Sequence, residues 1–228
     1  MTGVPEDVKR RPYQSQLRRE QAEQTRERVL DAAATLFVER GYDATSISSI
    51  AELAGVSPET VYARFRNKRT LIGELMQHAV RGADSRPIPE QEAPRALAAA
   101  TDQHEQLRLF AADIVLRLER AAPLAAVVAG AARSDPEIAG LYERLHQNRL
   151  ENMTTLIDAL TANGPLRLPP EQALETVWTL TSPELHQLLA RVRGWTRDRY
   201  RDWLTESLSA LLLGGDRRDR ARRSRRGG

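Results

Sequence analysis

The segment from Tyr42 to Phe65 constrains the fold more than any other part of this 228-residue chain. It contains two short stretches with apolar residues at helical spacing, separated by Gly55. A turn between two steeply crossing helices needs a residue that tolerates positive φ, and glycine meets that need. Ser57 is placed to cap the second helix, and Pro58 follows at its first position, where the missing N–H costs nothing. The segment therefore predicts a helix-turn-helix.

The same spacing predicts which faces of the two short helices are buried. Thr45 is expected to cap the first helix, whose buried stripe is formed by Ile47, Ile50, Ala51 and Ala54. In the second helix Val61 and Phe65 lie four residues apart and face inward. The face left to solvent comprises Glu59, Thr60, Ala63 and Arg64, with Tyr62 beside it. An ordinary helical hairpin is the alternative interpretation.

Helices are expected on both sides of this segment. An amphipathic helix begins near Thr25 and ends at Gly41, and another covers residues 67–81. Residues 1–24 contain two prolines and four arginines and predict a flexible basic arm. The prolines and charges of residues 82–93 predict a linker, so a helix-turn-helix domain with its connecting helix is assigned to residues 25–81.

Residues 82–215 show helical periodicity throughout, so the fold class is all-α. Pro123 is expected to end one helix, Pro136 to open a long one, and Pro183 to kink or divide a third. The expected helices cover residues 101–120, 124–132, 136–162, 169–193 and 196–213.

The last expected helix carries a long apolar stripe: Tyr200, Trp203, Leu204, Leu208, Leu211 and Leu212. Thr196 can cap this helix, with Trp195 and Tyr200 as a hydrophobic staple. A large apolar stripe tends to mark an interface, so we expect it to pack against a second copy of the chain. Burial within the same domain is the alternative.

Composition narrows the class of protein further. The chain has no cysteine, which excludes disulfides and thiolate sites. It has neither a long apolar run nor an apolar leader, so a cytoplasmic location is expected. The net charge of +3 separates into two basic ends and an acidic middle, which suggests a polyanionic partner. Residues 216–228, with seven arginines and two aspartates, predict a disordered tail.

Enzyme motifs are missing from the sequence: it has no glycine-rich phosphate loop, no nucleophile elbow and no His-Glu-x-x-His helix. Asp102 with His104, and Glu143 with His146, are the carboxylate–histidine pairs with metal-ligand spacing, although such pairs usually lie on surfaces. We expect no enzyme, no metal and no cofactor. The alternatives are a helical enzyme with a carboxylate/His site and a basic-ended nucleic-acid-binding protein without a sensor.

The N-terminal region resembles the tetracycline-repressor (TetR) family of bacterial transcription regulators. A second segment, residues 180–195, is similar to a C-terminal region of one subset of these regulators. The N-terminal resemblance is carried by Arg28 to Ala33, Leu36-Phe37, Gly41-Tyr42, Thr45-Ser46-Ile47, Ile50-Ala51, Ala54 to Ser57, Val61-Tyr62, Phe65 and Lys68.

The resemblance implies a homodimer whose subunits each combine a three-helix DNA-binding unit with a helical ligand-sensing and dimerisation domain. It implies a regulator, most often a repressor, that binds a palindromic operator in double-stranded DNA and is released by a small-molecule effector. The implied DNA contacts are Thr45, Ser46, Ser57, Pro58, Glu59, Thr60, Tyr62, Ala63, Arg64 and Lys68. The implied effector contacts are Phe110, Met153 and Trp178, and the implied dimer contacts are Leu188, Trp203, Leu204, Leu208, Leu211 and Leu212.

Overall fold

The computed structural model describes residues 7–84 and 86–213, and these residues form helices, turns and loops without a strand. Contacts divide the chain into two compact units that meet in the sequence between Leu75 and Met76. This point lies inside helix α4 (Lys68–Arg81), ahead of the boundary expected at the linker. The all-α class is confirmed, whereas the Arg-rich tail predicted at 216–228 lies outside the described residues.

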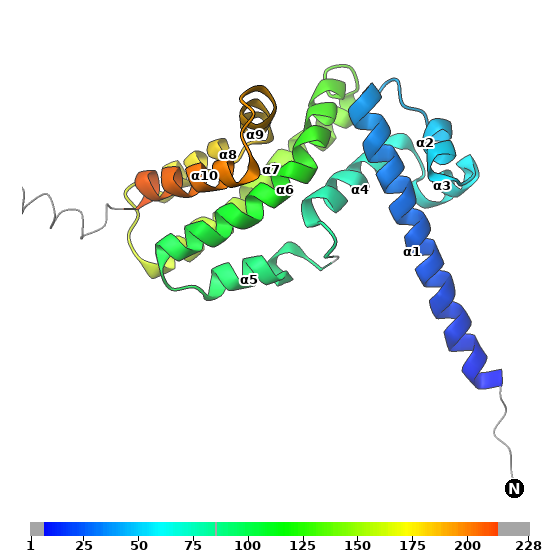
Figure 1. Cartoon of the computed structure of the whole chain (residues 1–228), viewed down its shortest axis with the longest axis horizontal. Coiled ribbons are helices and arrows are strands. Elements are labelled where there is room, and N and C mark those ends of the chain that lie inside the picture. Colours follow the sequence, from blue (N-terminus) through cyan, green and yellow to red (C-terminus); the bar gives the residue numbers. More distant parts are fainter. Residues whose placement is uncertain (1–6, 85, 214–228) are drawn as a thin grey trace, which may run out of the picture. The chain divides into compact units, whose positions relative to one another are not determined.

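The first unit consists of α1 (Asp7–Arg40), α2 (Ile47–Ala54), α3 (Pro58–Phe65) and the start of α4 (Figure 1). Gly55 ends α2 at φ +66°, as the turn requires, and its N–H donates back to α2. The Ser57 hydroxyl accepts from the Thr60 N–H and caps α3, with Pro58 at its first position. The predicted helix-turn-helix is thereby confirmed. Its core is formed by Val29, Leu30, Ala33, Phe37, Ile50, Ala51, Val61, Phe65, Leu71 and Ile72.

The first helix is longer than the sequence predicts. We expected a flexible arm over residues 1–24, but α1 begins at Asp7 and is continuous to Arg40. Gln16, Arg18, Arg19 and Glu20 are exposed, so no apolar stripe marks this extension in the sequence. Favourable helix propensities and pairs such as Gln16 with Glu20 (3.1 Å) support the helix, whose described side chains up to residue 24 are all exposed.

The second unit is a bundle built around α6 (Gln103–Ala131) and α7 (Pro136–Asn163), with α8 (Pro170–Leu180) and α10 (Arg197–Leu212) beside them (Figure 1). The short helix α5 (Glu92–Ala99) packs on α6, and α9 (Pro183–Gln187) runs into a π-helical turn, η2 (Leu188–Val192). The shared core includes Leu107, Val115, Met153, Leu160, Val177, Tyr200, Leu204 and Leu208.

Two internal prolines have different outcomes. Pro123 was expected to end a helix, but α6 passes through it, so the separate helix predicted at 124–132 is wrong. Ala121, Ala122 and Leu124 are all buried, and this packing outweighs the one backbone hydrogen bond that proline removes. Pro183 does divide its segment, because α8 ends at Leu180 and α9 begins at Pro183.

The predicted linker at 82–93 is partly ordered. It contains a turn of 3₁₀-helix, η1 (Ile88–Glu90), and the first residues of α5, a helix that the sequence analysis missed. Gln91 holds this segment, because its side-chain amide donates to the carbonyls of Arg81, Asp84 and Arg86 at 3.0–3.3 Å.

The apolar stripe of α10 faces inward, which corrects the expected dimer contacts at three positions. Leu204, Leu208 and Leu212 are completely buried within their own chain, so they cannot contact a second copy. They pack in the core against α6 and α8. Leu211 is 45% exposed, and Trp203 is partly buried against Trp195 and Tyr200.

Candidate functional site

Helix α3 presents one polar face outside the core of the first unit. Val61 and Phe65 are buried and fix the rotation of the helix. Tyr62 is 52% exposed. The other exposed residues on this face are Ser57, Glu59, Thr60, Ala63 and Arg64, while Pro58 is half-buried. A short helix with a polar exposed face and a fixed rotation has the form that enters a DNA major groove.

The start of α3 is organised by hydrogen bonds among its own side chains. The Ser57 hydroxyl lies 3.3 Å from the Thr60 N–H and 3.2 Å from the Thr60 hydroxyl. Hydrogen bonds from the backbone N–H of Glu59 and from Ser57 lower the pKa of the Glu59 carboxyl, so it is ionised at neutral pH. An ionised carboxylate accepts from the cytosine amino group and repels phosphate, so Glu59 favours base contact over backbone contact.

Arg64 has a partner that the sequence analysis did not find. Its guanidinium lies 3.5 Å from the Glu23 carboxylate of α1, and Glu23 also pairs with Arg26 at 3.2 Å. Arg26 in turn lies 3.6 Å from Glu74 of α4. Glu23 and Arg64 are 41 positions apart, so no local pattern predicts the pair. Both side chains are exposed, so the pair contributes little energy and leaves Arg64 available to guanine.

Thr45 does not cap α2, contrary to the sequence analysis. Ser46 is the cap, with a reciprocal pair of hydrogen bonds to Ser49. Thr45 is buried, and its hydroxyl donates to the carbonyls of Leu36 (3.1 Å) and Gly41 (2.8 Å). Its side chain therefore ties the end of α1 to the start of α2 and does not face a DNA phosphate, whereas Ser46 is exposed.

Lys68, at the first position of α4, is half-buried and serves the fold. Its ammonium donates to the carbonyls of Tyr42 (2.8 Å) and Thr45 (3.0 Å) and lies 4.2 Å from the centroid of the Tyr42 ring. The charge is therefore held at the junction of α1, α2 and α4. Phosphate binding by Lys68 stays a prediction.

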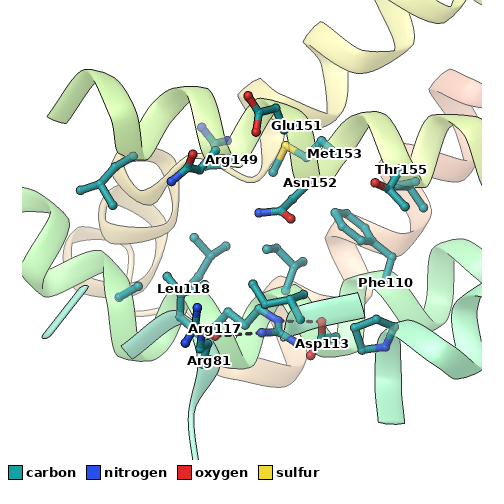
Figure 2. Close-up of a pocket in the computed structure, with 18 of the residues that line it drawn as sticks. Arg81, Phe110, Asp113, Arg117, Leu118, Arg149, Glu151, Asn152, Met153 and Thr155 are labelled. Carbon is teal, nitrogen blue, oxygen red and sulfur yellow. Dashed lines mark hydrogen bonds and ion pairs between the residues drawn. The ribbon is translucent and has the colours of Figure 1, made fainter. Parts of the chain in front are cut away.

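The second unit contains a cavity of about 560 Å³. In Figure 2, Arg149, Asn152, Met153 and Thr155 of α7 lie along one side, and Phe110, Asp113, Arg117 and Leu118 of α6 lie along the other. Residues from the end of α4, from α5 and from α9 complete the wall. A largely apolar cavity of this size with a few polar groups is typical of a small-molecule site.

One side of the cavity is held by a network around Arg117, which is buried. Its guanidinium donates to Asp113 (2.7 Å), to the Val80 carbonyl (2.9 Å) and to the Gln91 side-chain oxygen (2.8 Å). Arg120 donates to the Ala79 carbonyl (2.9 Å). Both arginines thus bind free carbonyls at the C-terminal end of α4 and fix that end against α6.

The structure separates the three expected effector contacts. Phe110 and Met153 line the cavity, and effector contact by these two residues stays a prediction. Trp178 is not on the wall but lies behind it, where its ring stacks on the Arg149 guanidinium at 4.7 Å. Arg149 and His146, which do line the cavity, escaped the sequence analysis as effector contacts because their surroundings come from helices distant in sequence.

Residues 29–75 match the family described as bacterial regulatory proteins, tetR family. Over this segment the chain is similar to the tetR family. It is 46% identical over 56 residues to the HTH-type transcriptional regulator YvkB of Bacillus subtilis, which is 24% of this chain and 30% of YvkB. It is 40% identical over 58 residues to the HTH-type transcriptional regulator TtgR of Pseudomonas putida, 25% of this chain and 28% of TtgR. The chain thus spans less than a third of these relatives.

The likeness in fold to a solved structure extends beyond this matched segment. The native crystal structure of NalD, the secondary repressor of the MexAB-OprM multidrug efflux pump in Pseudomonas aeruginosa, superposes with a TM-score of 0.65 at 23% identity. The superposition covers 86% of this chain and 98% of NalD. The matched relatives are named as transcriptional regulators and this structure as a repressor.

The carboxylate–histidine pairs named as possible metal ligands make other contacts in the structure. Asp102 caps α6 by accepting from the Glu105 N–H at 2.8 Å. His146 packs edge-on against Tyr142, with ring centroids 4.3 Å apart. Over residues 7–84 and 86–213, no group of three or more His, Asp or Glu side chains is arranged to hold a metal ion. Over the same residues, no helix combines the length and apolar character needed to cross a bilayer.

Proposed function

We propose that this chain is a transcriptional repressor that binds a palindromic operator as a homodimer and is released by a small molecule. The observation that carries the proposal is the polar face of α3, held outward by buried Val61 and Phe65. In this proposal the residues that contact base edges are Ser57, Glu59, Thr60 and Arg64, and Tyr62 contacts a DNA phosphate. Repression is supported by the likeness to NalD, which is named as a repressor.

Apolar residues exposed near the C-terminal end of the second unit support a dimer. Leu188 is 52% exposed, Val192 73% and Leu211 45%. Exposed apolar side chains in neighbouring elements mark an interface, and a two-fold dimer presents two copies of α3 to two half-sites. Leu188 and Leu211 therefore remain proposed dimer contacts, together with Trp203.

Helix α4 offers a route by which a bound molecule acts on DNA binding. Its first half carries Leu71 and Ile72, which are buried in the core of the helix-turn-helix unit. Its second half carries Met76 and Val80, which line the cavity of the second unit. A molecule that displaces Met76 or Val80 therefore moves a helix that belongs to the DNA-binding unit, which is the coupling that the proposal needs.

Selection of bound sequences from random double-stranded DNA tests the proposal. The wild-type chain is expected to enrich an inverted repeat whose half-sites are separated by about one helical turn. Arg64→Ala should relax the preference at one position of each half-site and weaken binding by about ten- to hundredfold. Arg108→Ala is the matched control, because it removes an exposed arginine of α6 that pairs with Glu105.

The outcome that contradicts the proposal is equally specific. If selection enriches no sequence and binding disappears at moderate salt, the chain binds DNA through its basic ends alone. If Arg64→Ala and Arg108→Ala behave alike, α3 is not the element that contacts bases.

A further inference from the structure

Arg149 is a half-buried cation whose hydrogen-bonding capacity is only partly used. It lies on α7 in the cavity wall, and its Nη2 donates to the Trp178 carbonyl and to the Thr181 hydroxyl. Its Nε and Nη1 are shielded from water and have no hydrogen-bond partner. Within residues 7–84 and 86–213, no carboxylate lies within ion-pairing distance of the guanidinium. A buried guanidinium normally has such a partner, because an uncompensated charge is costly to bury.

The charge persists despite its surroundings. Burial lowers the pKa of Arg149 to about 10, partly offset by the negative charge of Glu184, so the side chain is still cationic at neutral pH. Burial, reinforced by the neighbouring Arg149 charge, also lowers the pKa of His146, which is therefore neutral. Arg149 thus brings a positive charge to this end of the cavity, which the carboxylate of Glu184 opposes at longer range.

The other charged groups of the cavity do not neutralise Arg149. Asp113 is paired with Arg117 at 2.7 Å, and Glu151 accepts a hydrogen bond from Gln147 at 3.1 Å. Glu184 is exposed on α9 and acts on Arg149 only at a distance. An anion entering the cavity would therefore be the first direct ionic partner of Arg149.

The same site would not favour a cationic molecule. The aromatic face that could attract it, the ring of Trp178, already stacks on the Arg149 guanidinium at 4.7 Å. A second cation at this place would be repelled by Arg149. The aromatic group of Tyr142, His146 and Trp178 therefore supports the arginine and does not form a cage for a ligand cation.

Beyond Arg149 the cavity wall is mostly apolar. Phe110, Ile114, Leu118 and Leu156 contribute hydrocarbon or aromatic surface, and Met153 adds a thioether. We propose that the effector is an amphipathic carboxylic acid, whose carboxylate binds the free nitrogens of Arg149 and whose apolar body lies along these side chains. The proposal requires the Arg149 side chain to rotate so that Nε and Nη1, which are shielded in this structure, face the ligand. The proposal rests on the effector-binding role argued above and specifies the chemistry of its site.

Three probes of equal length separate the possible chemistries: decanoate, decanamide and decylamine. Titration calorimetry on the full-length chain should show decanoate binding about ten- to hundredfold more tightly than decanamide, the range for a hydrogen bond to a charged group. Decylamine should bind most weakly. Equal binding of the three, tighter binding of decylamine, or no heat from decanoate at about 1 mM would each overturn the proposal.

Variants of two arginines on α7 test whether the preference for decanoate depends on Arg149. Arg149→Gln should bind decanoate and decanamide alike. If Arg149→Gln folds poorly, Arg149→Lys is the second variant. It keeps the positive charge and should therefore still bind decanoate more tightly than decylamine. Arg144→Gln removes an exposed arginine of α7 that does not line the cavity, and should bind all three probes as the wild type does. A decanoate preference that survives Arg149→Gln would refute the assignment.

Operator binding measured on the same samples separates this proposal from the proposed function. Sequence-specific DNA binding without a decanoate preference would overturn the carboxylate proposal and leave DNA binding intact. A decanoate preference without sequence-specific DNA binding would overturn the proposed function and leave the carboxylate proposal intact.

Discussion

Truncation of Leu208 to alanine tests whether the apolar stripe of α10 belongs to the core of the chain or to its dimer interface. The Leu208 side chain has no exposed surface and packs in the cluster shared by α6, α8 and α10. Removing a fully buried leucine costs its transfer free energy plus that of the cavity left behind, about 3 kcal/mol in total. Urea unfolding followed by circular dichroism should show this loss as a midpoint lower by about 1–3 M.

Leu211 is the matched control, because it is the same residue type on the same helix and is 45% exposed. Leu211→Ala should cost less than about 1 kcal/mol at protein concentrations at which the chain is monomeric, and more at concentrations at which the wild type is dimeric, because Leu211 is a proposed dimer contact. The loss caused by Leu208→Ala should be similar at low and high protein concentration. A smaller loss for Leu208→Ala than for Leu211→Ala would refute the inward orientation of the stripe.

Three further changes test separate parts of the structure. Thr45→Val removes a buried hydroxyl that bonds two carbonyls, so it should lower stability by about 1–3 kcal/mol and leave the affinity for the selected DNA nearly unchanged. A large loss of DNA affinity in a stable Thr45→Val protein would instead support the predicted contact of Thr45 with a DNA phosphate. Burial lowers the pKa of His146 and of His186, so the unfolded chain binds more protons below about pH 6.5 and stability should fall as the pH drops through this value. In urea titrations across this range, His186→Gln should flatten the dependence, and an unchanged slope would exclude His186 as a cause. Arg66 adopts φ +62°, a conformation that favours glycine, so Arg66→Gly should raise stability by about 1 kcal/mol in thermal unfolding, and an equal gain from Arg66→Ala would show that strain is not the cause.

The helix-turn-helix could be predicted from sequence because its signals are local. Gly55, Ser57 and Pro58 act within one turn of the positions where they stand, and the structure confirms their roles. Thr45 shows the limit of such reasoning. A threonine beside a helix start looks like a cap, but its neighbour Ser46 has the capping geometry and Thr45 bonds to the end of α1.

Two helices were harder to predict. The extension of α1 has no one-sided apolar pattern, and the apolar pattern of α10 does not by itself show what that helix packs against. The extension of α1 is exposed where its side chains are described, so hydrophobic periodicity does not reveal it. In α10 the periodicity correctly identified an apolar face. It could not say what covers that face, because the same stripe serves a core or an interface.

The polar groups of the cavity could not be predicted, because they are assembled over long sequence separations. Arg117 meets Gln91 across 26 positions, and Arg149 meets Trp178 across 29. Each arginine alone resembles an ordinary charged residue on a helix. Only the packing of α6, α7 and α8 shows that all the guanidinium nitrogens of Arg117 have partners, whereas two nitrogens of Arg149 have none.

The central claim is that α3 confers sequence-specific DNA binding, and the most direct test compares two DNA duplexes over a range of salt concentrations. One duplex carries the inverted repeat obtained by selection, and the other carries a shuffled sequence of the same composition. Fluorescence anisotropy should show affinity for the repeat at least about 10³-fold higher at physiological salt. Equal affinities with the same salt dependence would contradict the claim, because phosphate attraction alone would then account for all of the binding.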